Sequence, residues 1–154
     1  LPGNVLPDHQ LIAFARDDDY FFGVLHARPH ALWARRQGTQ LREATSGSRY
    51  TPTTSFETYP LPWPPGQEPA EADDERIAGI AAAARDLAAQ RDAWLAGHPG
   101  QGLTALYNAN PTWLQLAHRA LDHAVLAAYG WPADLDDEDM LRRLLALNQE
   151  RAAR

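Results

Sequence analysis

The sequence predicts a mainly α protein, with a small α+β piece at the N-terminal end followed by a helical bundle. Apolar residues recur at three- and four-residue spacing through most of residues 73–154, a pattern typical of packed amphipathic helices. Residues 45–65 instead hold a Gly/Ser loop and five prolines, which exclude a long helix. We therefore divide the chain into residues 1–65, a linker at 66–72 and a helical domain at 73–154.

The composition is that of a folded domain rather than a disordered segment. The chain has 154 residues, of which 45% are hydrophobic and five are tryptophan. The absence of cysteine excludes disulfides, thiolate metal sites and a cysteine nucleophile. The chain begins Leu-Pro-Gly rather than with Met, and no stretch resembles a signal peptide or a membrane span. We expect a soluble piece of a longer protein, with no membrane partner.

The N-terminal piece is expected to contain a strand, a helix and an extended strap. Residues 11–15 form a short apolar run compatible with a buried strand. The acidic run at 17–19 would cap a helix over residues 20–36, in which Pro29 either kinks or restarts the helix. Residues 50–65, YTPTTSFETYPLPWPP, then predict an edge strand or a strap packed across a surface, because proline favours extended backbone.

Three further helices are expected after the linker. The first begins at the acidic residues 73–75 and ends at the Gly-His-Pro-Gly stretch 97–100. The second begins at Asn110-Pro111, where the Asn side chain would cap the helix and Pro would occupy its first position. The third is capped by Asp136.

Positive and negative charges gather in different regions of the chain. Between residues 20 and 55 there are five arginines and one acid, a net charge of +4, whereas residues 63–154 have a net charge of −6. Guanidinium groups suit bidentate contacts to phosphate or to guanine edges, so this region is a candidate DNA-binding surface. The alternative is an ordinary solvated surface, and the residues alone do not decide between the two. The candidates are Arg28, Arg35, Arg36, Arg42 and Arg49.

Other clusters have simpler structural explanations. His26 and His30 have the spacing of two metal ligands on a helix, but a third ligand is missing, so we favour packed histidines and predict no metal site. The acids at 17–19 are interpreted as a helix cap rather than a metal site. His118 and Asp122 share a helix face and predict a structural hydrogen bond. The sequence has no Gly-rich phosphate loop, no Gly-x-Ser-x-Gly motif and no lysine, so we predict no catalytic residue in this chain.

Three stretches resemble one known family. They are RDDDYFFGVLHARPHALWARRQGTQL (16–41), RYTPTTSFETYPLP (49–62) and LTALYNANPTWLQLAHRALDHAVLAAYGWPADLDDEDMLRRLLALN (103–148). The first two resemble the end of the target-recognition domain of the MmeI-like DNA methyltransferases of bacterial restriction–modification systems. The third resembles the helical C-terminal domain of the same enzymes. Ala27 stands where Ser is common, and Tyr59 where Phe is common.

The resemblance implies a parent enzyme that transfers a methyl group from S-adenosylmethionine to an adenine amino group in a defined DNA sequence. Its methyltransferase domain would lie N-terminal to residue 1, so this chain would need no cofactor of its own. Residues 1–65 would be the last part of a recognition domain that binds double-stranded DNA, with the five arginines mostly on phosphates. The acidic helices would brace that domain, in a cytoplasmic enzyme. The alternative is a helical interaction module without DNA contacts of its own.

Overall fold

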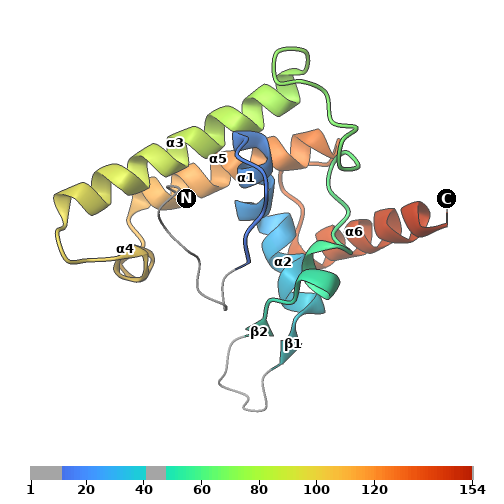
Figure 1. Cartoon of the computed structure of the whole chain (residues 1–154), viewed down its shortest axis with the longest axis horizontal. Helices are drawn as coiled ribbons and strands as arrows, with labels where there is room; N and C mark the ends of the chain where they lie inside the picture. Colours follow the sequence, from blue (N-terminus) through green and yellow to red (C-terminus); the bar gives the residue numbers. More distant parts are fainter. Residues whose placement is uncertain (1–11, 41–47, 154) are drawn as a thin grey trace.

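The computed structural model describes residues 12–40 and 48–153, and of these it describes 39–40 and 48–49 by their backbone only. This part of the chain is mainly helical, as predicted (Figure 1). The α-helices are α1 (Asp19–His26), α2 (Arg28–Gln37), α3 (Glu75–Gly97), α4 (Leu103–Ala109), α5 (Thr112–Ala128) and α6 (Asp137–Ala152). A π-helical turn, η1 (Pro52–Phe56), and an antiparallel ribbon of β1 (Thr39–Gln40) and β2 (Ser48–Arg49) complete the elements.

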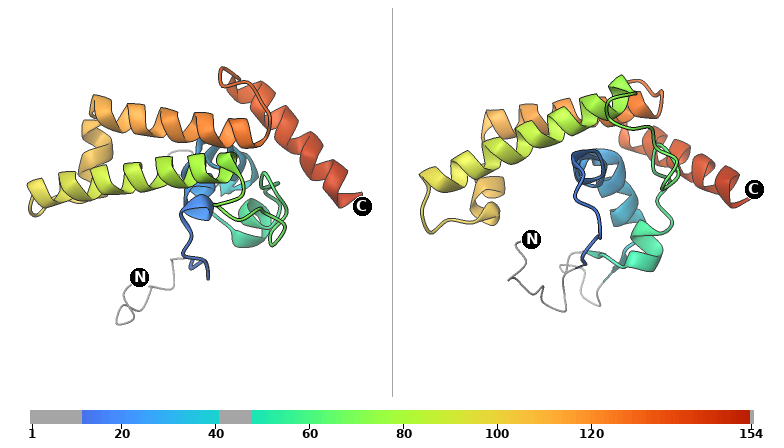
Figure 2. Two further views of the ribbon diagram at one scale, coloured as in Figure 1. Left: turned by 90° about the horizontal axis from the view of Figure 1, so that it is seen from above. Right: turned by 45° about the horizontal axis from the view of Figure 1, so that its top comes forward.

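Two long helices organise the molecule. α3 and α5 lie side by side, and α4 joins them at the end away from α6 (Figures 1 and 2). α1 packs beneath the pair, mostly against α3, and α2 continues from α1 toward η1 and α6. The ribbon of β1 and β2 projects from the far end of α2 (Figure 1). No helix in the described part of the chain combines the length and apolarity that crossing a bilayer requires.

One hydrophobic core takes side chains from both sides of the predicted linker. Val24 of α1, Ile80 of α3 and Leu121 of α5 are all fully buried in it. Tyr59 and Leu61, from the proline-rich segment, are 5% and 6% exposed and belong to the same cluster. The boundary at residues 66–72 stays a prediction, but removing either side of it would leave the other with exposed apolar surface.

Local signals in the sequence placed several helix ends correctly. Asp18 caps α1 by accepting a hydrogen bond from the Phe21 N–H at 2.8 Å. Asp136 caps α6 in the same way, with the Asp139 N–H as donor at 2.8 Å. The chain leaves α1 at Ala27, whose backbone is extended, and restarts as α2 with proline in the first turn. The expected restart near Pro29 is thus confirmed.

Four local predictions were wrong. Four helices rather than three follow residue 72, because Leu103–Ala109 form the additional helix α4. The described residues of the apolar run, 12–15, form no strand, and the side chain of Ile12 is 37% exposed. Residues 52–56 form the turn η1 rather than extended backbone. Pro52 is compatible with this turn because it lies in the first turn, where no backbone N–H is needed. Asn110 does not cap α5: it ends α4 in the left-handed conformation, with φ of 43°, which asparagine tolerates.

Candidate nucleic-acid interface

The first predicted DNA-binding residue, Arg28, is held by α6. Its Nε donates to Oδ1 of Asp137 at 2.8 Å, Nη2 contacts the same oxygen, and Nη1 donates to the Leu135 carbonyl at 3.1 Å. These bonds join the start of α2 to the start of α6. The guanidinium group therefore already has acceptors within the protein, which sets Arg28 apart from Arg35 and Arg36.

Arg35 and Arg36 lie in the last turn of α2, and both are exposed. No carboxylate among the described residues pairs with either of them. The chain then enters the ribbon, in which Arg49 of β2 is in register with Thr39 of β1. Arg42 lies outside the described residues. We call the last turn of α2 together with the ribbon the cationic end; its role in DNA binding stays a prediction.

Side chains of the strap fix the orientation of α2. The Trp33 Nε1–H donates to the hydroxyl oxygen of Thr58 at 3.0 Å. His30 is 6% exposed, and its two ring nitrogens lie 2.8 Å from the Leu25 carbonyl oxygen and 3.1 Å from the Tyr50 hydroxyl. Burial lowers the pKa of His30, which favours the neutral ring. With both nitrogens engaged, His30 acts as a structural bracket between α1, α2 and the strap.

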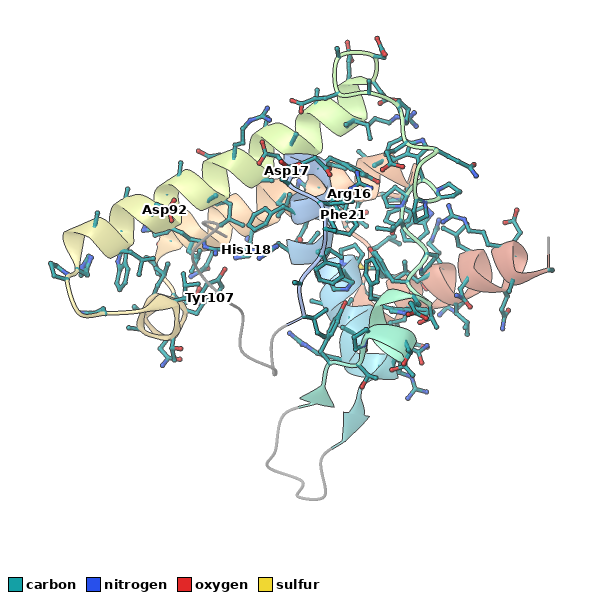
Figure 3. All side chains as sticks on the ribbon, in the orientation of Figure 1. Arg16, Asp17, Phe21, Asp92, Tyr107 and His118 are labelled. Atoms are coloured by element: carbon teal, nitrogen blue, oxygen red, sulfur yellow. The ribbon has the colours of Figure 1, made fainter. Side chains whose placement is uncertain are left out.

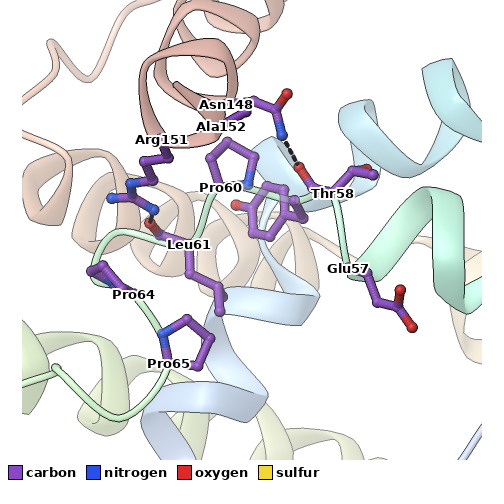
Figure 4. Close-up of a pocket in the computed structure, with 10 residues that line it drawn as sticks. Glu57, Thr58, Pro60, Leu61, Pro64, Pro65, Asn148, Arg151 and Ala152 are labelled. Carbon is purple, nitrogen blue, oxygen red and sulfur yellow. Dashed lines mark hydrogen bonds between the residues drawn. The ribbon is translucent and has the colours of Figure 1, made fainter. Parts of the chain in front are cut away.

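The strap is in turn held by α6 and by the end of α5. Asn148 Nδ2 donates to the Thr58 carbonyl at 2.7 Å, and Arg151 donates to the Leu61 carbonyl at 2.6 Å (Figure 4). Arg151 also donates to the Pro62 carbonyl at 3.2 Å. The Tyr129 hydroxyl lies 2.8 Å from the carbonyl oxygen of Pro60. Proline-rich backbone has few N–H groups but many free carbonyls, and these side chains supply the missing donors.

A bond between α5 and α2 replaces the predicted bond between His118 and Asp122. Asp122 Oδ1 accepts from the Arg28 backbone N–H at 2.7 Å, so it caps α2, whose own N-cap residue Ala27 has no side-chain acceptor. Burial raises the pKa of Asp122. His118 Nε2 lies 2.9 Å from the Tyr107 hydroxyl instead. Sequence reasoning missed this cap because its two residues are 94 positions apart.

The acidic run and the remaining histidine of the suggested metal pair also have structural roles. Asp19 accepts from Arg85 of α3 at 2.9 Å, which ties α1 to α3, and Asp18 is the α1 cap. His26 stacks on Phe22, and its Nδ1 lies 2.9 Å from the Phe22 carbonyl oxygen. Among the described residues, no group of three or more His, Asp or Glu side chains is arranged to hold a metal ion.

Comparison with solved structures gives one informative similarity. The chain resembles part of the Type IIL restriction–modification enzyme MmeI, whose structure was determined in complex with DNA. The TM-score is 0.73 at 25% sequence identity, over 90% of this chain but 17% of the MmeI chain. This chain thus corresponds in length to a minor part of that enzyme. No family model and no curated protein matches the chain.

Proposed function

We propose that this chain is the DNA-recognition and structural C-terminal part of an S-adenosylmethionine-dependent adenine-N6 DNA methyltransferase of a restriction–modification system. The observation that carries the proposal is the similarity to MmeI, which extends over 90% of the chain at 25% sequence identity. Three sequence stretches, 16–41, 49–62 and 103–148, also resemble MmeI-like enzymes and support the proposal.

Within this proposal, the cationic end binds the DNA backbone. Arg35 and Arg36 are exposed, pair with no described carboxylate, and lie directly before the ribbon that carries Arg49. Guanidinium groups in this state are free to replace the counterions of DNA phosphates. Arg28 donates to Asp137 and Leu135, so we expect it to contribute less to DNA affinity than Arg35 or Arg36.

The rest of the chain holds the cationic end in place. Residues 1–65 would be the last part of the target-recognition domain, 66–72 its linker, and 73–154 the helical domain that supports it. The contacts of Arg151 and Asn148 with the strap carbonyls, and of Asp122 and Asp137 with Arg28, give this support a physical basis. Chemistry on a base inside a duplex requires extruding that base, so a methyltransferase domain needs a separate, rigidly held domain to grip the DNA.

Duplex binding at varied salt tests the DNA-binding role. We expect the chain to bind duplex DNA at low salt, measured by fluorescence anisotropy, with an affinity that falls as salt rises. Replacing both Arg35 and Arg36 by Ala should weaken binding and reduce the slope of log affinity against log salt by about 2. Arg142→Ala is the matched control, because Arg142 is exposed on α6 and pairs with Glu138 and Asp139.

The same measurement decides between the proposal and its alternative, a helical interaction module without DNA contacts. Absence of duplex binding at low salt would favour the interaction module. The shared core and the contacts of α6 with the strap are consistent with that module as well as with the proposal. The methyl-transfer part is tested separately by the coding sequence that precedes Leu1. We expect a Gly-rich S-adenosylmethionine motif and an Asn-Pro-Pro-aromatic loop there, and their absence would refute that part.

A further inference from the structure

A polar pocket of about 310 Å³ lies where α5 meets the start of α2. Most of its lining comes from one face of α5, because residues three and four positions apart lie along the same side of a helix. Arg28 of α2 also lines it, so the pocket joins the helical domain to the helix that ends in the cationic end. Its polar residues on α5 are Gln115, His118, Arg119, Asp122 and His123.

Arg119 is a free cation at this pocket. Its side chain is exposed, and among the described residues it pairs with no carboxylate and contacts no aromatic ring. In this respect Arg119 matches Arg35 and Arg36 of the cationic end. The other exposed arginines that the structure describes in residues 73–154 have partners: carboxylates for Arg76, Arg85 and Arg142, and the Trp131 ring for Arg143.

The charged groups of the lining favour an anion. Arg28 uses three of the five N–H groups of its guanidinium on Asp137 and Leu135, which leaves two. The lining has one carboxylate, Asp122, and its Oδ1 already accepts from the Arg28 backbone N–H. Two arginines and one aspartate, with the histidines counted as neutral, give the lining a net charge of +1. Asp137 lies outside the lining and is paired with Arg28.

His118 is already engaged within the protein. Its Nε2 lies 2.9 Å from the Tyr107 hydroxyl of α4, and Figure 3 shows the two side chains beside each other. The ring is therefore held toward α4, and the donors that the pocket offers to an anion are those of its arginines.

The pocket lies in line with the cationic end. Arg28 and Arg35 are seven residues apart in α2, which is nearly two turns, so they share a helix face at a separation of about 10 Å. Arg35 is exposed, and the Arg28 side chain is 37% exposed. A row of arginines thus runs from Arg119 on α5, past Arg28, to the last turn of α2.

We propose that Arg119 binds a backbone phosphate of the same DNA duplex that the cationic end contacts. This inference rests on the proposed function and extends it to the helical domain. The DNA backbone repeats its phosphates along each strand, so a row of guanidinium groups on one face suits it. The sequence concealed this contact, because Arg119 belongs to a region, residues 63–154, with a net charge of −6.

Duplex binding at several salt concentrations, measured by fluorescence anisotropy, tests the role of Arg119. Arg119→Ala should weaken binding about fivefold or more at low salt and reduce the slope of log affinity against log salt by about 1. Two duplexes of unrelated sequence should lose affinity equally, because a phosphate contact carries no sequence information. Arg119→Lys should keep the slope. Arg142→Ala, which removes an exposed but ion-paired arginine, should change neither affinity nor slope.

The possible outcomes separate this inference from the proposed function. A wild-type chain that binds no duplex at low salt overturns both. If the wild-type chain binds and Arg35→Ala/Arg36→Ala lowers the slope, but Arg119→Ala behaves like Arg142→Ala, the cationic end stands and the role of Arg119 is refuted. If Arg119→Ala lowers the slope with an unchanged urea midpoint, Arg119 acts through DNA rather than through the fold. The triple variant should then lower the slope by about 3.

Discussion

Gly23 of α1 lies so close to Ile80 of α3 that a Cβ atom at position 23 would come within 2.7 Å of Ile80 Cγ2. The same atom would be 3.1 Å from Ala84 Cβ and 3.2 Å from Leu121 Cδ1. A glycine in the middle of a helix costs stability by itself, so its place here has a packing reason. It lets α1 approach α3 and α5 closely, which joins the N-terminal piece to the helical domain.

Gly23→Ala should therefore destabilise the fold. We expect the free energy of unfolding to fall by about 1–3 kcal/mol, the usual cost of overpacking a core. Gly79→Ala is the matched control, because Gly79 lies in α3 with nothing within 4 Å of the added methyl. That control should stabilise the helix by roughly 0.5–1 kcal/mol. Urea unfolding of both variants measures the difference, and equal stabilities would contradict the packing argument.

Arg28 and Arg36 should respond oppositely to stability and DNA assays. Arg28→Ala removes the bonds to Asp137 and Leu135 and should lower the free energy of unfolding by about 1 kcal/mol, a figure reduced for its partial exposure. Arg36→Ala should change it by less than about 0.5 kcal/mol. For duplex affinity we expect the reverse, with a larger loss in Arg36→Ala than in Arg28→Ala. Equal losses of affinity in both variants would mean that Arg28 leaves Asp137 to bind DNA.

The link between α6 and the strap is tested at Arg151. Arg151→Ala leaves the Leu61 and Pro62 carbonyls without their donor and should cost about 1–2 kcal/mol of unfolding free energy. Arg142→Ala on the same helix breaks only exposed ion pairs and should cost less than about 0.5 kcal/mol. Hydrogen exchange of the Tyr59 and Leu61 amides should become faster only in Arg151→Ala. Unchanged exchange in that variant would show that α6 does not hold the strap.

The stability of the fold should decrease when the solution is acidified through the histidine range. Burial lowers the pKa of His30, so the unfolded chain, with a histidine pKa of about 6.5, takes up a proton before the folded chain does. Stability is therefore lost as pH falls below about 6.5 toward the pKa of the folded state, and it is retained above that range.

Urea unfolding at several values between about pH 7.5 and about pH 5 measures this loss. Burial also lowers the pKa of His26 and His118, so these residues likewise reduce the free energy of unfolding as pH falls. The raised pKa of Asp122 has the opposite effect at lower pH, because the folded chain takes up that proton first. Comparison with His30→Gln isolates the contribution of His30, because the variant should be less stable but should show a smaller pH dependence. An identical pH dependence in the two proteins would exclude His30 as a source.

The long helices, several of their ends and the segregation of charge along the chain could be predicted from the sequence alone. Asp18 and Asp136 mark helix starts by accepting hydrogen bonds from backbone N–H groups three residues later, and apolar spacing depends only on the 3.6-residue turn. These signals are local, so neighbouring residues suffice to read them. The resemblance on which the function rests is also a property of residue order.

Only the tertiary structure decided which arginines remain free and what holds the strap. Asp122 caps α2 by accepting from the Arg28 N–H, 94 positions earlier, and Asp137 accepts from the Arg28 guanidinium group. Arg151 donates to the Leu61 carbonyl, 90 positions earlier. Residues 12–15 do not form the predicted strand, because in the described part of the chain no strand lies beside them to pair with. Hydrogen bonds and ion pairs between distant segments depend on how the helices pack, and a linear pattern contains no record of that packing.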